Sequence, residues 1–329
     1  MSRAGRGPER DRHLRGAARS DRPRNGGHGD VVTVGTFDGV HRGHWAVLEE
    51  IARRAAASGG RSVLVTFEPH PLAIVNPEAA PRLLTLADEK RAVLAESAVD
   101  HVAFVPFTHA LSLYSPVQFV RDVLEKRFAL GELVIGYDHG FGRGRSGDVE
   151  LLRSLAQEDG FRVDVVPAVM MDGRPVSSTL IRRAVAGGDL ETARRGLGRW
   201  YSATAPVVRG AGRGRGIGVP TVNLAPLPTN KLLPPDGVYA ARVDVEGERR
   251  GAMLNLGPRP TFGDATRTLE AHLFDFAGDL VGRTITVEFL RRLRDTVRFS
   301  SAEALKAQLA RDRADALRAL TELGDAATL

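Results

Sequence analysis

VVTVGTFDGVHRGH, residues 31–44, carries the clearest structural signal in this chain. An apolar run is followed by a tight glycine turn and by a helix entered through His41 and His44, which lie about one turn apart. A helix N-terminus presents unpaired N–H groups and a partial positive charge, which suit phosphate. Two imidazoles and fixed backbone donors at one point are what nucleotidyl transfer needs, because negative charge grows on the α-phosphate oxygens. The stretch therefore predicts phosphate chemistry at the end of a strand.

The string GTFDGVHRGH, residues 35–44, resembles the N-terminal module of the prokaryotic bifunctional riboflavin kinase/FAD synthetase family. Its last four residues match the H-x-G-H signature of Rossmann-like nucleotidyltransferases. Two histidines near a helix start are more often plain surface residues, but the preceding strand, the glycines and the aspartate favour a site. The resemblance implies catalytic roles for His41 and His44. It also implies contacts to nucleotide or phosphate from Gly35, Phe37, Asp38 and Gly39.

The composition is that of an ordinary globular protein. The 329 residues are enough for two domains, and the hydrophobic fraction of 43% and charged fraction of 26% are typical values. There is no cysteine, which excludes disulfides, a thiolate nucleophile and a cysteine-ligated metal. No apolar run approaches the ~20 residues that a membrane span needs. We therefore expect a cytoplasmic protein without a membrane partner.

The net charge of +6 is concentrated at the N-terminus. Residues 1–30 hold eight arginines and four acids, so the remaining 299 residues carry only +2. This Arg/Gly-rich leader has almost no large apolar side chains and cannot bury a core, so we expect it to be disordered. An arm that touches nucleic acid and an upstream, mis-assigned start codon are the other readings. We expect no nucleic-acid partner.

Short β-rich runs alternate with amphipathic helices over residues 31–187. The candidate strands are residues 31–34, 62–67, 101–105, 132–136 and 162–166. Their nearly continuous apolar character suits a parallel sheet that is covered on both faces. We therefore expect an α/β Rossmann-like nucleotidyltransferase domain with its site at the carboxyl ends of the strands.

Local signals predict where several helices begin and end. Ser115 followed by Pro116 predicts a helix start. Asp148 is expected to cap a helix over 149–158, and Gly160 to end it.

The pattern changes near residue 200, where glycine and proline become frequent and alternating strands replace the earlier rhythm. Residues 238–245, 268–276 and 284–290 read as strands of a small antiparallel β-barrel over 202–329, after a linker at 188–201. The resemblance identifies this barrel as the riboflavin kinase type. Ser300 and Glu303 read as the capping box of a C-terminal helix. Its apolar positions are Leu305, Leu309, Ala316, Leu317 and Leu320.

Two further motifs belong to the first predicted domain. Residues 176–182, VSSTLIR, start a helix and resemble the S-S-T-x-I-R element that binds ATP phosphates in this family. The implied phosphate-binding residues are Ser177, Ser178, Thr179 and Arg182, of which Arg182 can donate a two-pronged hydrogen bond. Asp138, in the glycine-rich segment after the fourth strand, is expected to contact the nucleotide or the flavin phosphate region. His139 stands where the family often has an aromatic residue, so its role is open.

The second domain opens with a glycine- and arginine-rich segment, residues 208–218. Alone it could be a linker or an RNA-touching loop. The following residues, VPTVNL at 219–224, resemble the riboflavin kinase segment G-x-P-T-x-N-L. The resemblance implies Mg²⁺ ligation by Thr221 and Asn223, whose neutral oxygens suit a Mg²⁺ already held by phosphates. It also implies that the loop covers the ATP phosphates, with Gly212, Arg213, Gly214 and Gly218. Val219 replaces the family's usual phenylalanine.

Residues 269–276, LEAHLFDF, alternate so that Glu270 and His272 share one face of a strand. A lone strand glutamate is usually solvated. Here Glu270 matches the glutamate that serves as the general base of riboflavin kinases, so the resemblance implies a catalytic role.

The combined reading is a bifunctional enzyme of flavin cofactor synthesis, with the resemblance covering about residues 31–320. The C-terminal barrel would phosphorylate riboflavin with ATP and Mg²⁺ to give FMN. The N-terminal domain would transfer AMP from ATP to FMN, giving FAD and pyrophosphate. Two alternatives stay open: a nucleotidyltransferase for another phosphorylated acceptor, and a basic RNA-binding or regulatory protein. The sequence does not give the oligomeric state.

Overall fold

The chain forms two compact units in the computed structural model, which describes residues 29–137, 148–210, 219–258 and 267–324. The first unit comprises the chain up to Pro81 together with Lys90–Val169. The second comprises Arg82–Glu89 and the chain from Met170 onward. Nearly all of the predicted leader at 1–30 lies outside the described residues. The predicted domain limits at 31–187 and 202–329 stay a prediction.

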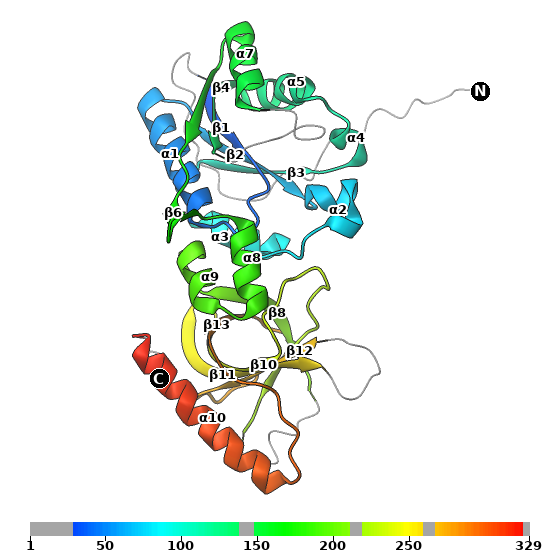
Figure 1. The fold of residues 1–329 in the computed structure, drawn as a ribbon, viewed down its shortest axis with the longest axis vertical. Coiled ribbons are helices and arrows are strands. Elements are labelled where there is room, and N and C mark those ends of the chain that lie inside the picture. The colour runs from blue at the N-terminus through cyan, green and yellow to red at the C-terminus, as the bar shows by residue number, and fades with distance from the viewer. Residues whose placement is uncertain (1–28, 138–147, 211–218, 259–266, 325–329) are drawn as a thin grey trace, which may run out of the picture. The chain divides into compact units, whose positions relative to one another are not determined.

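The first unit is built on a five-stranded parallel sheet in the order β3-β2-β1-β4-β5 (Figure 1). Each predicted strand of this domain is present, within two residues at either end. The strands are β1 (Asp30–Val34), β2 (Ser62–Glu68), β3 (His101–Pro106), β4 (Leu130–Gly136) and β5 (Arg162–Val166). The strand order reverses at β1: β2 and β3 lie on one side of it, and β4 and β5 lie on the other. The carboxyl end of β1 is thus the switch point where ligands bind in such sheets.

Helices cover both faces of this sheet, as the apolar strands require. Alternate β1 residues point to opposite faces, so Val31 packs with Leu48 and Ile51 of α1 (Arg42–Ser58), whereas Val32 packs on the other side. The other face is covered by α5 (Pro116–Phe119), the π-helical η2 (Val120–Glu125) and α7 (Val149–Asp159). Figure 1 shows the sheet between α1 and these helices.

The remaining helices of this half of the chain are short. They are α2 (Pro71–Val75), η1 (Pro77–Ala79), α3 (Ala87–Ala95), α4 (His109–Ser112) and α6 (Lys126–Phe128). The predicted helix ends are confirmed. Ser115 caps α5 with Pro116 at its first position, Asp148 caps α7, and Gly160 ends α7 in the left-handed conformation.

The second unit contains a closed antiparallel barrel with strand order β10-β11-β12-β9-β8-β13. The strands are β8 (Tyr201–Val208), β9 (Val222–Leu224), β10 (Gly237–Val245), β11 (Glu248–Pro258), β12 (Arg267–Leu273) and β13 (Thr284–Arg294). The three strands predicted here correspond to β10, β12 and β13. The barrel is filled by side chains that include the fully buried Tyr201, Tyr239 and Phe289. Ligands must therefore bind outside it.

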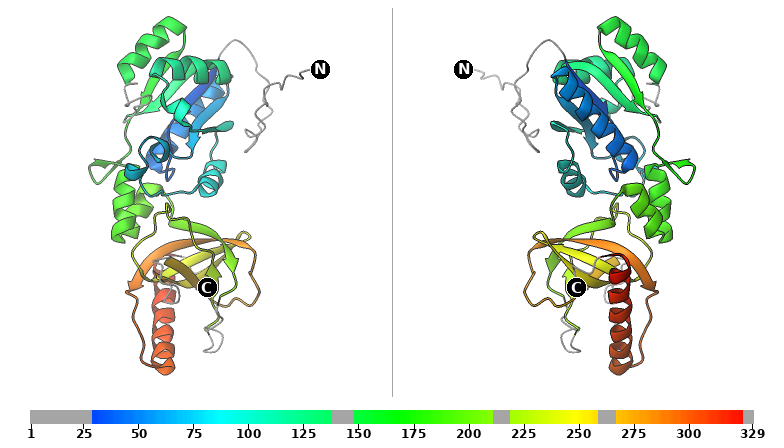
Figure 2. Two further views of the ribbon diagram at one scale, coloured as in Figure 1. Left: turned by 90° about the vertical axis from the view of Figure 1, so that its right-hand side faces the viewer. Right: turned by 90° about the vertical axis from the view of Figure 1, so that its left-hand side faces the viewer.

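Helices and a short hairpin complete the second unit. The hairpin of β6 (Met170–Met171) and β7 (Arg174–Pro175) precedes α8 (Ser178–Gly187) and α9 (Leu190–Leu197). The C-terminal α10 (Ala302–Glu322) lies against the outside of the barrel, where Ala316, Ala319 and Leu320 pack on Met253 and Phe274 (Figure 2). The predicted capping box was wrong by one residue, because Ser301 and not Ser300 accepts the hydrogen bond that caps α10.

A buried ion pair fixes Arg82–Glu89 within the second unit. The Lys231 ammonium is fully buried and lies 2.6 Å from Glu89 Oε2, while donating to the carbonyl oxygens of Leu84 and Ser202. Glu89 Oε1 also accepts from the Thr204 backbone N–H at 2.9 Å. Removing one partner of such a pair leaves an uncompensated buried charge, which is far costlier than losing a surface pair.

We expect Glu89→Gln to destabilise the second unit by about 3–5 kcal/mol, and Glu89→Gln combined with Lys231→Met to recover most of that loss. The chain has two tryptophans, so in a Trp45→Phe background urea unfolding can be followed by Trp200 fluorescence alone.

Glu248→Gln is the matched control. Glu248 pairs with Arg250 on β11 but is largely exposed, so its loss should change stability by less than about 1 kcal/mol. A Glu89→Gln variant as stable as this control would contradict the importance given to the buried pair.

Candidate functional site

The turn that joins β1 to α1 is conformationally strained. Phe37, Gly39 and Val40 all have positive φ, at 48°, 81° and 38°. Such values cost glycine little but are rare for a β-branched residue such as valine. Asp38 and Phe37 are buried within this turn. Strain of this kind persists only where the surrounding structure enforces it, and it is often found at functional sites.

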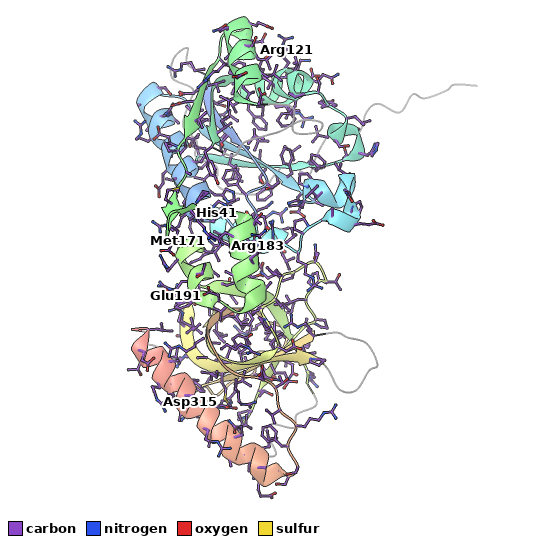
Figure 3. The ribbon with its side chains drawn as sticks, viewed as in Figure 1. His41, Arg121, Met171, Arg183, Glu191 and Asp315 are labelled. Atoms are coloured by element: carbon purple, nitrogen blue, oxygen red, sulfur yellow. The ribbon has the colours of Figure 1, made fainter. Side chains whose placement is uncertain are left out.

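The two histidines cap α1 reciprocally. His41 is the N-cap residue, and its Nδ1 accepts a hydrogen bond from the His44 backbone N–H at 3.3 Å. The Nδ1 of His44 accepts in turn from the His41 backbone N–H, also at 3.3 Å. This is the geometry of a capping box, with two imidazoles in place of the usual hydroxyl and carboxylate. Figure 3 shows His41 at the amino-terminal end of α1.

Reciprocal capping dictates where each ring carries its proton. A nitrogen that accepts a hydrogen bond has no proton of its own, so Nδ1 is unprotonated in both rings and Nε2 carries the N–H. The rings are stacked on each other with centroids 3.6 Å apart, and the Phe37 ring stacks on His44 at 4.5 Å. Both imidazoles are therefore held in one orientation as Nε2–H donors.

The carboxyl end of β2 lies beside this turn. Thr66 Oγ1 donates to the Thr36 carbonyl oxygen at 3.1 Å. The buried Lys90 ammonium donates to the carbonyl oxygens of both Thr36 and Phe67. Sequence reasoning missed Lys90, although its spacing of four residues from the buried Leu94 places it on the inward stripe of α3.

The SSTLIR element forms the start of α8 and belongs to the second unit. Ser177 caps the helix by accepting from the Leu180 N–H at 3.2 Å, and Ser178 is the first helical residue. Thr179 is exposed, and Arg182 Nε donates to the Arg82 carbonyl oxygen at 3.1 Å. The capping role of Ser177 accounts for one hydroxyl, while the phosphate-binding role of the four residues stays a prediction.

Several predicted site residues lie outside the described part of the chain. They are Asp138, Gly212, Arg213, Gly214 and Gly218, and the open position His139.

The predicted kinase residues come together on the outside of the barrel. In the antiparallel pairing of β9 with β12, Asn223 lies directly opposite Glu270. Leu269 and Ala271 are buried inside the barrel, so Glu270 points outward. Asn255 on β11 lies opposite Glu270 on its other side. Thr221 is exposed just before β9, two residues from Asn223.

The neighbours of Asn223 restrict its position. A β-carbon on Gly210 would overlap the Asn223 side-chain amide, so this amide lies close to the Gly210 backbone. His272 Nδ1 lies 2.7 Å from the Pro220 carbonyl oxygen, which ties β12 to the residue before Thr221. Val219 packs in the apolar cluster beneath α10, so a smaller side chain than the family's phenylalanine still contributes to packing.

The residues at this face fit a magnesium ion that is shared with phosphate. Thr221 and Asn223 present hydroxyl and amide oxygens, which are hard donors of the kind that Mg²⁺ prefers. No three His, Cys, Asp or Glu side chains among the described residues gather in a way that could hold a metal alone. Two neutral oxygens suit a Mg²⁺ ion that phosphate oxygens of the nucleotide would also hold.

Comparison with known families divides the chain in the same order as its motifs. The family model described as FAD synthetase matches residues 24–180, and the model described as riboflavin kinase matches residues 197–320. The part of the chain that the structure describes holds no helix long and apolar enough to cross a membrane.

Curated relatives match across almost the whole chain. A bifunctional riboflavin kinase/FMN adenylyltransferase from Pseudomonas fluorescens is 40% identical, covering 89% of this chain and 93% of its own. The protein of the same name from Escherichia coli K12 is 39% identical, covering 86% and 90%.

A solved structure shares the fold. It is described as a macrolide-efflux protein from Streptococcus pneumoniae and is 29% identical, with a TM-score of 0.78 over 88% of this chain and 94% of that one. Both family models, the curated relatives and the order of the motifs agree. The chain thus belongs to the bifunctional riboflavin kinase/FMN adenylyltransferase family, whose two ATP-dependent reactions convert riboflavin to FMN and FMN to FAD.

Proposed function

We propose that the two reactions take place at two separate sites, each within one predicted domain. FMN is adenylylated at the carboxyl end of β1, and the reciprocal capping of α1 by His41 and His44 carries this assignment. Riboflavin is phosphorylated on the outer face of the barrel, and the pairing of Asn223 with Glu270 supports this second assignment. The domains are those at 31–187 and 202–329.

At the first site, a phosphate oxygen of FMN attacks the α-phosphorus of ATP, and pyrophosphate leaves. Negative charge grows on the α-phosphate oxygens during this step. The Nε2–H groups of His41 and His44 and the backbone N–H groups at the start of α1 donate to those oxygens. Because the capping box fixes both rings beforehand, no reorientation is needed in the transition state. Gly35, Phe37, Asp38 and Gly39 shape the turn that positions the nucleotide.

Further phosphate contacts of the adenylylation reaction are proposed from the family's motifs. Ser177, Ser178, Thr179 and Arg182 contact ATP phosphates, and Asp138 contacts the nucleotide or the FMN phosphate. For the kinase reaction, the loop with Gly212, Arg213, Gly214 and Gly218 covers the phosphates of the second ATP.

At the second site, the terminal ribityl hydroxyl of riboflavin attacks the γ-phosphorus of ATP, and ADP leaves. Glu270 accepts the proton of that hydroxyl and orients its oxygen, which matters more than activation in phosphoryl transfer. Thr221 and Asn223 would hold Mg²⁺ together with phosphate oxygens, and the ion would neutralise the charge on the transferring group.

We propose a cytoplasmic location and no nucleic-acid partner. ATP, the co-substrate of both reactions, is a cytoplasmic metabolite. The positive charge that would attract RNA lies mostly in residues 1–30, and the rest of the chain carries only +2.

We expect His41→Ala and His44→Ala each to slow conversion of FMN to FAD by roughly 10²–10³, the usual cost of losing one transition-state donor. Phosphorylation of riboflavin should be nearly unchanged. Supplying riboflavin or FMN with Mg²⁺ and ATP, and separating FMN from FAD by chromatography, measures both rates. An equal loss of both activities would contradict the assignment of two sites.

We expect Glu270→Gln to slow FMN formation by about 10²–10⁴, because the amide keeps the size of the side chain but cannot accept a proton. Conversion of supplied FMN to FAD should continue at the normal rate. The control is the double variant Glu270→Gln, Asn255→Asp, which places a carboxylate on the adjacent strand β11. This carboxylate should not restore the rate. Near-normal phosphorylation by Glu270→Gln would make this glutamate a solvated strand residue.

Asn223→Ala should behave differently from Glu270→Gln. Its loss removes one oxygen ligand, so the requirement for Mg²⁺ should rise and excess Mg²⁺ should partly restore the kinase rate. The measurement is the Mg²⁺ dependence of riboflavin phosphorylation in both variants. A fall in rate that no Mg²⁺ concentration relieves would argue against a metal-binding role for Asn223.

A further inference from the structure

Lys90 on α3 has a buried ammonium group in the first unit. Its side chain is only 7% exposed. The ammonium donates to the Phe67 carbonyl oxygen at 3.0 Å and to the Thr36 carbonyl oxygen at 3.3 Å, and Glu68 Oε2 lies 3.9 Å away. Thr36 follows β1 and Phe67 is near the end of β2, so one cation joins the carboxyl ends of two neighbouring strands.

This arrangement is costly for a lysine. Burial lowers the pKa of Lys90 below its ordinary value, and the carboxylates of Glu68 and Asp38 act in the opposite direction. A methionine of similar length would fill the same space without that desolvation cost. The desolvation cost of the buried lysine has a reason if the protein needs the Thr36 and Phe67 carbonyl groups held in place.

The Thr36 carbonyl leads directly to the proposed adenylylation site. The next residue is Phe37, which has a positive φ of 48° and stacks its ring on that of His44. A shift of the Thr36 peptide would therefore move the Phe37 ring and with it the support of His44. The same carbonyl also accepts from Thr66 Oγ1, so α3 and β2 both hold it.

We infer that Lys90 is a positioning residue for FMN adenylylation: its ammonium holds the Thr36 and Phe67 carbonyl groups so that the turn keeps Phe37 and His44 in the reactive geometry. This inference rests on the proposed role of His41 and His44. Lys90 touches no reacting atom. It acts on the rate through the turn that joins β1 to α1.

The first variant is Lys90→Met, with Lys126→Met as its matched control because Lys126 is in the same unit and 72% exposed. We expect Lys90→Met to lower kcat for FAD formation by about 10–100-fold, the scale of a 1 Å misplacement, with little change in KM. Riboflavin phosphorylation and the Lys126→Met variant should be normal. A Lys90→Met variant that is folded and has a normal kcat would overturn the inference.

A spectroscopic measurement separates positioning from general loss of structure. In ¹⁵N-histidine-labelled protein, the ring signals of His44 should shift in Lys90→Met. Those of His101, at the amino end of β3 in the same unit, should not. Equal shifts at His101 and His44 would show a general structural effect and would overturn the inference.

The absence of cysteine from the chain allows a chemical rescue. In Lys90→Cys, alkylation with 2-bromoethylamine under denaturing conditions followed by refolding installs a lysine-like ammonium at position 90. Alkylation with bromoethane installs a neutral group instead. The aminoethyl product should regain most of the lost kcat and the ethyl product should not. Equal activity of the two products would overturn the inference.

The natural chain, which has no cysteine, is taken through the same alkylation and refolding steps. Its activity afterwards shows how much is lost in refolding alone. His41→Ala is assayed in parallel to separate the inference from the proposed function. If His41→Ala forms FAD at the normal rate, the proposed site itself fails. If His41→Ala is slow and Lys90→Met is normal, only the role of Lys90 fails.

Discussion

The reciprocal capping of α1 by His41 and His44 is the interaction on which the proposed adenylylation site depends. A helix start leaves backbone N–H groups without partners, and side chains usually satisfy them with oxygen. Here two imidazole Nδ1 atoms take that role, because each accepts a hydrogen bond from the backbone N–H of the other histidine. The same hydrogen bonds that begin the helix thus fix the tautomer of both rings. The strained turn before the helix, with Val40 at positive φ, brings His41 to the N-cap position.

The two proposed sites are built by different means. In the first, parallel strands end at one edge, and loops after β1 and β2 meet there because the strands are neighbours. In the second, antiparallel register places Asn223 beside Glu270 on the outer face of a barrel whose interior is filled. Loop conformation therefore matters most at the first site, and strand register at the second.

Local patterns in the sequence predicted much of this structure. Continuous apolar runs located the parallel strands, and the caps at Ser115 and Asp148 were recognisable from single residues. At α10 the neighbouring serines 300 and 301 are equally good caps, and the sequence offers no reason to choose Ser301. Alternation predicted the face of Glu270, whereas its partner Asn223 on the neighbouring strand depends on a register that no local pattern contains.

Buried charges were the main features that sequence reasoning missed. A lysine in a helix is normally read as solvent-exposed, and the spacing that places Lys90 on the inward face of α3 does not reveal the two carbonyl groups that it binds. Lys231 and Glu89 are 142 residues apart, so their pairing depends on the tertiary fold. It follows that a fragment starting at 187 would lack Arg82–Glu89, which is part of the second unit. Tests of the two activities are therefore better made with point variants of the full chain.

The protonation of the two histidines tests the central claim most directly. The measurement is a ¹⁵N–¹H correlation spectrum of the ¹⁵N-histidine-labelled chain at neutral pH, with assignments from the His41→Ala and His44→Ala variants. We expect that in both rings Nδ1 has the shift of an unprotonated nitrogen and Nε2 that of an N–H. A protonated Nδ1 in either ring would contradict it, because that nitrogen could not then accept the capping hydrogen bond.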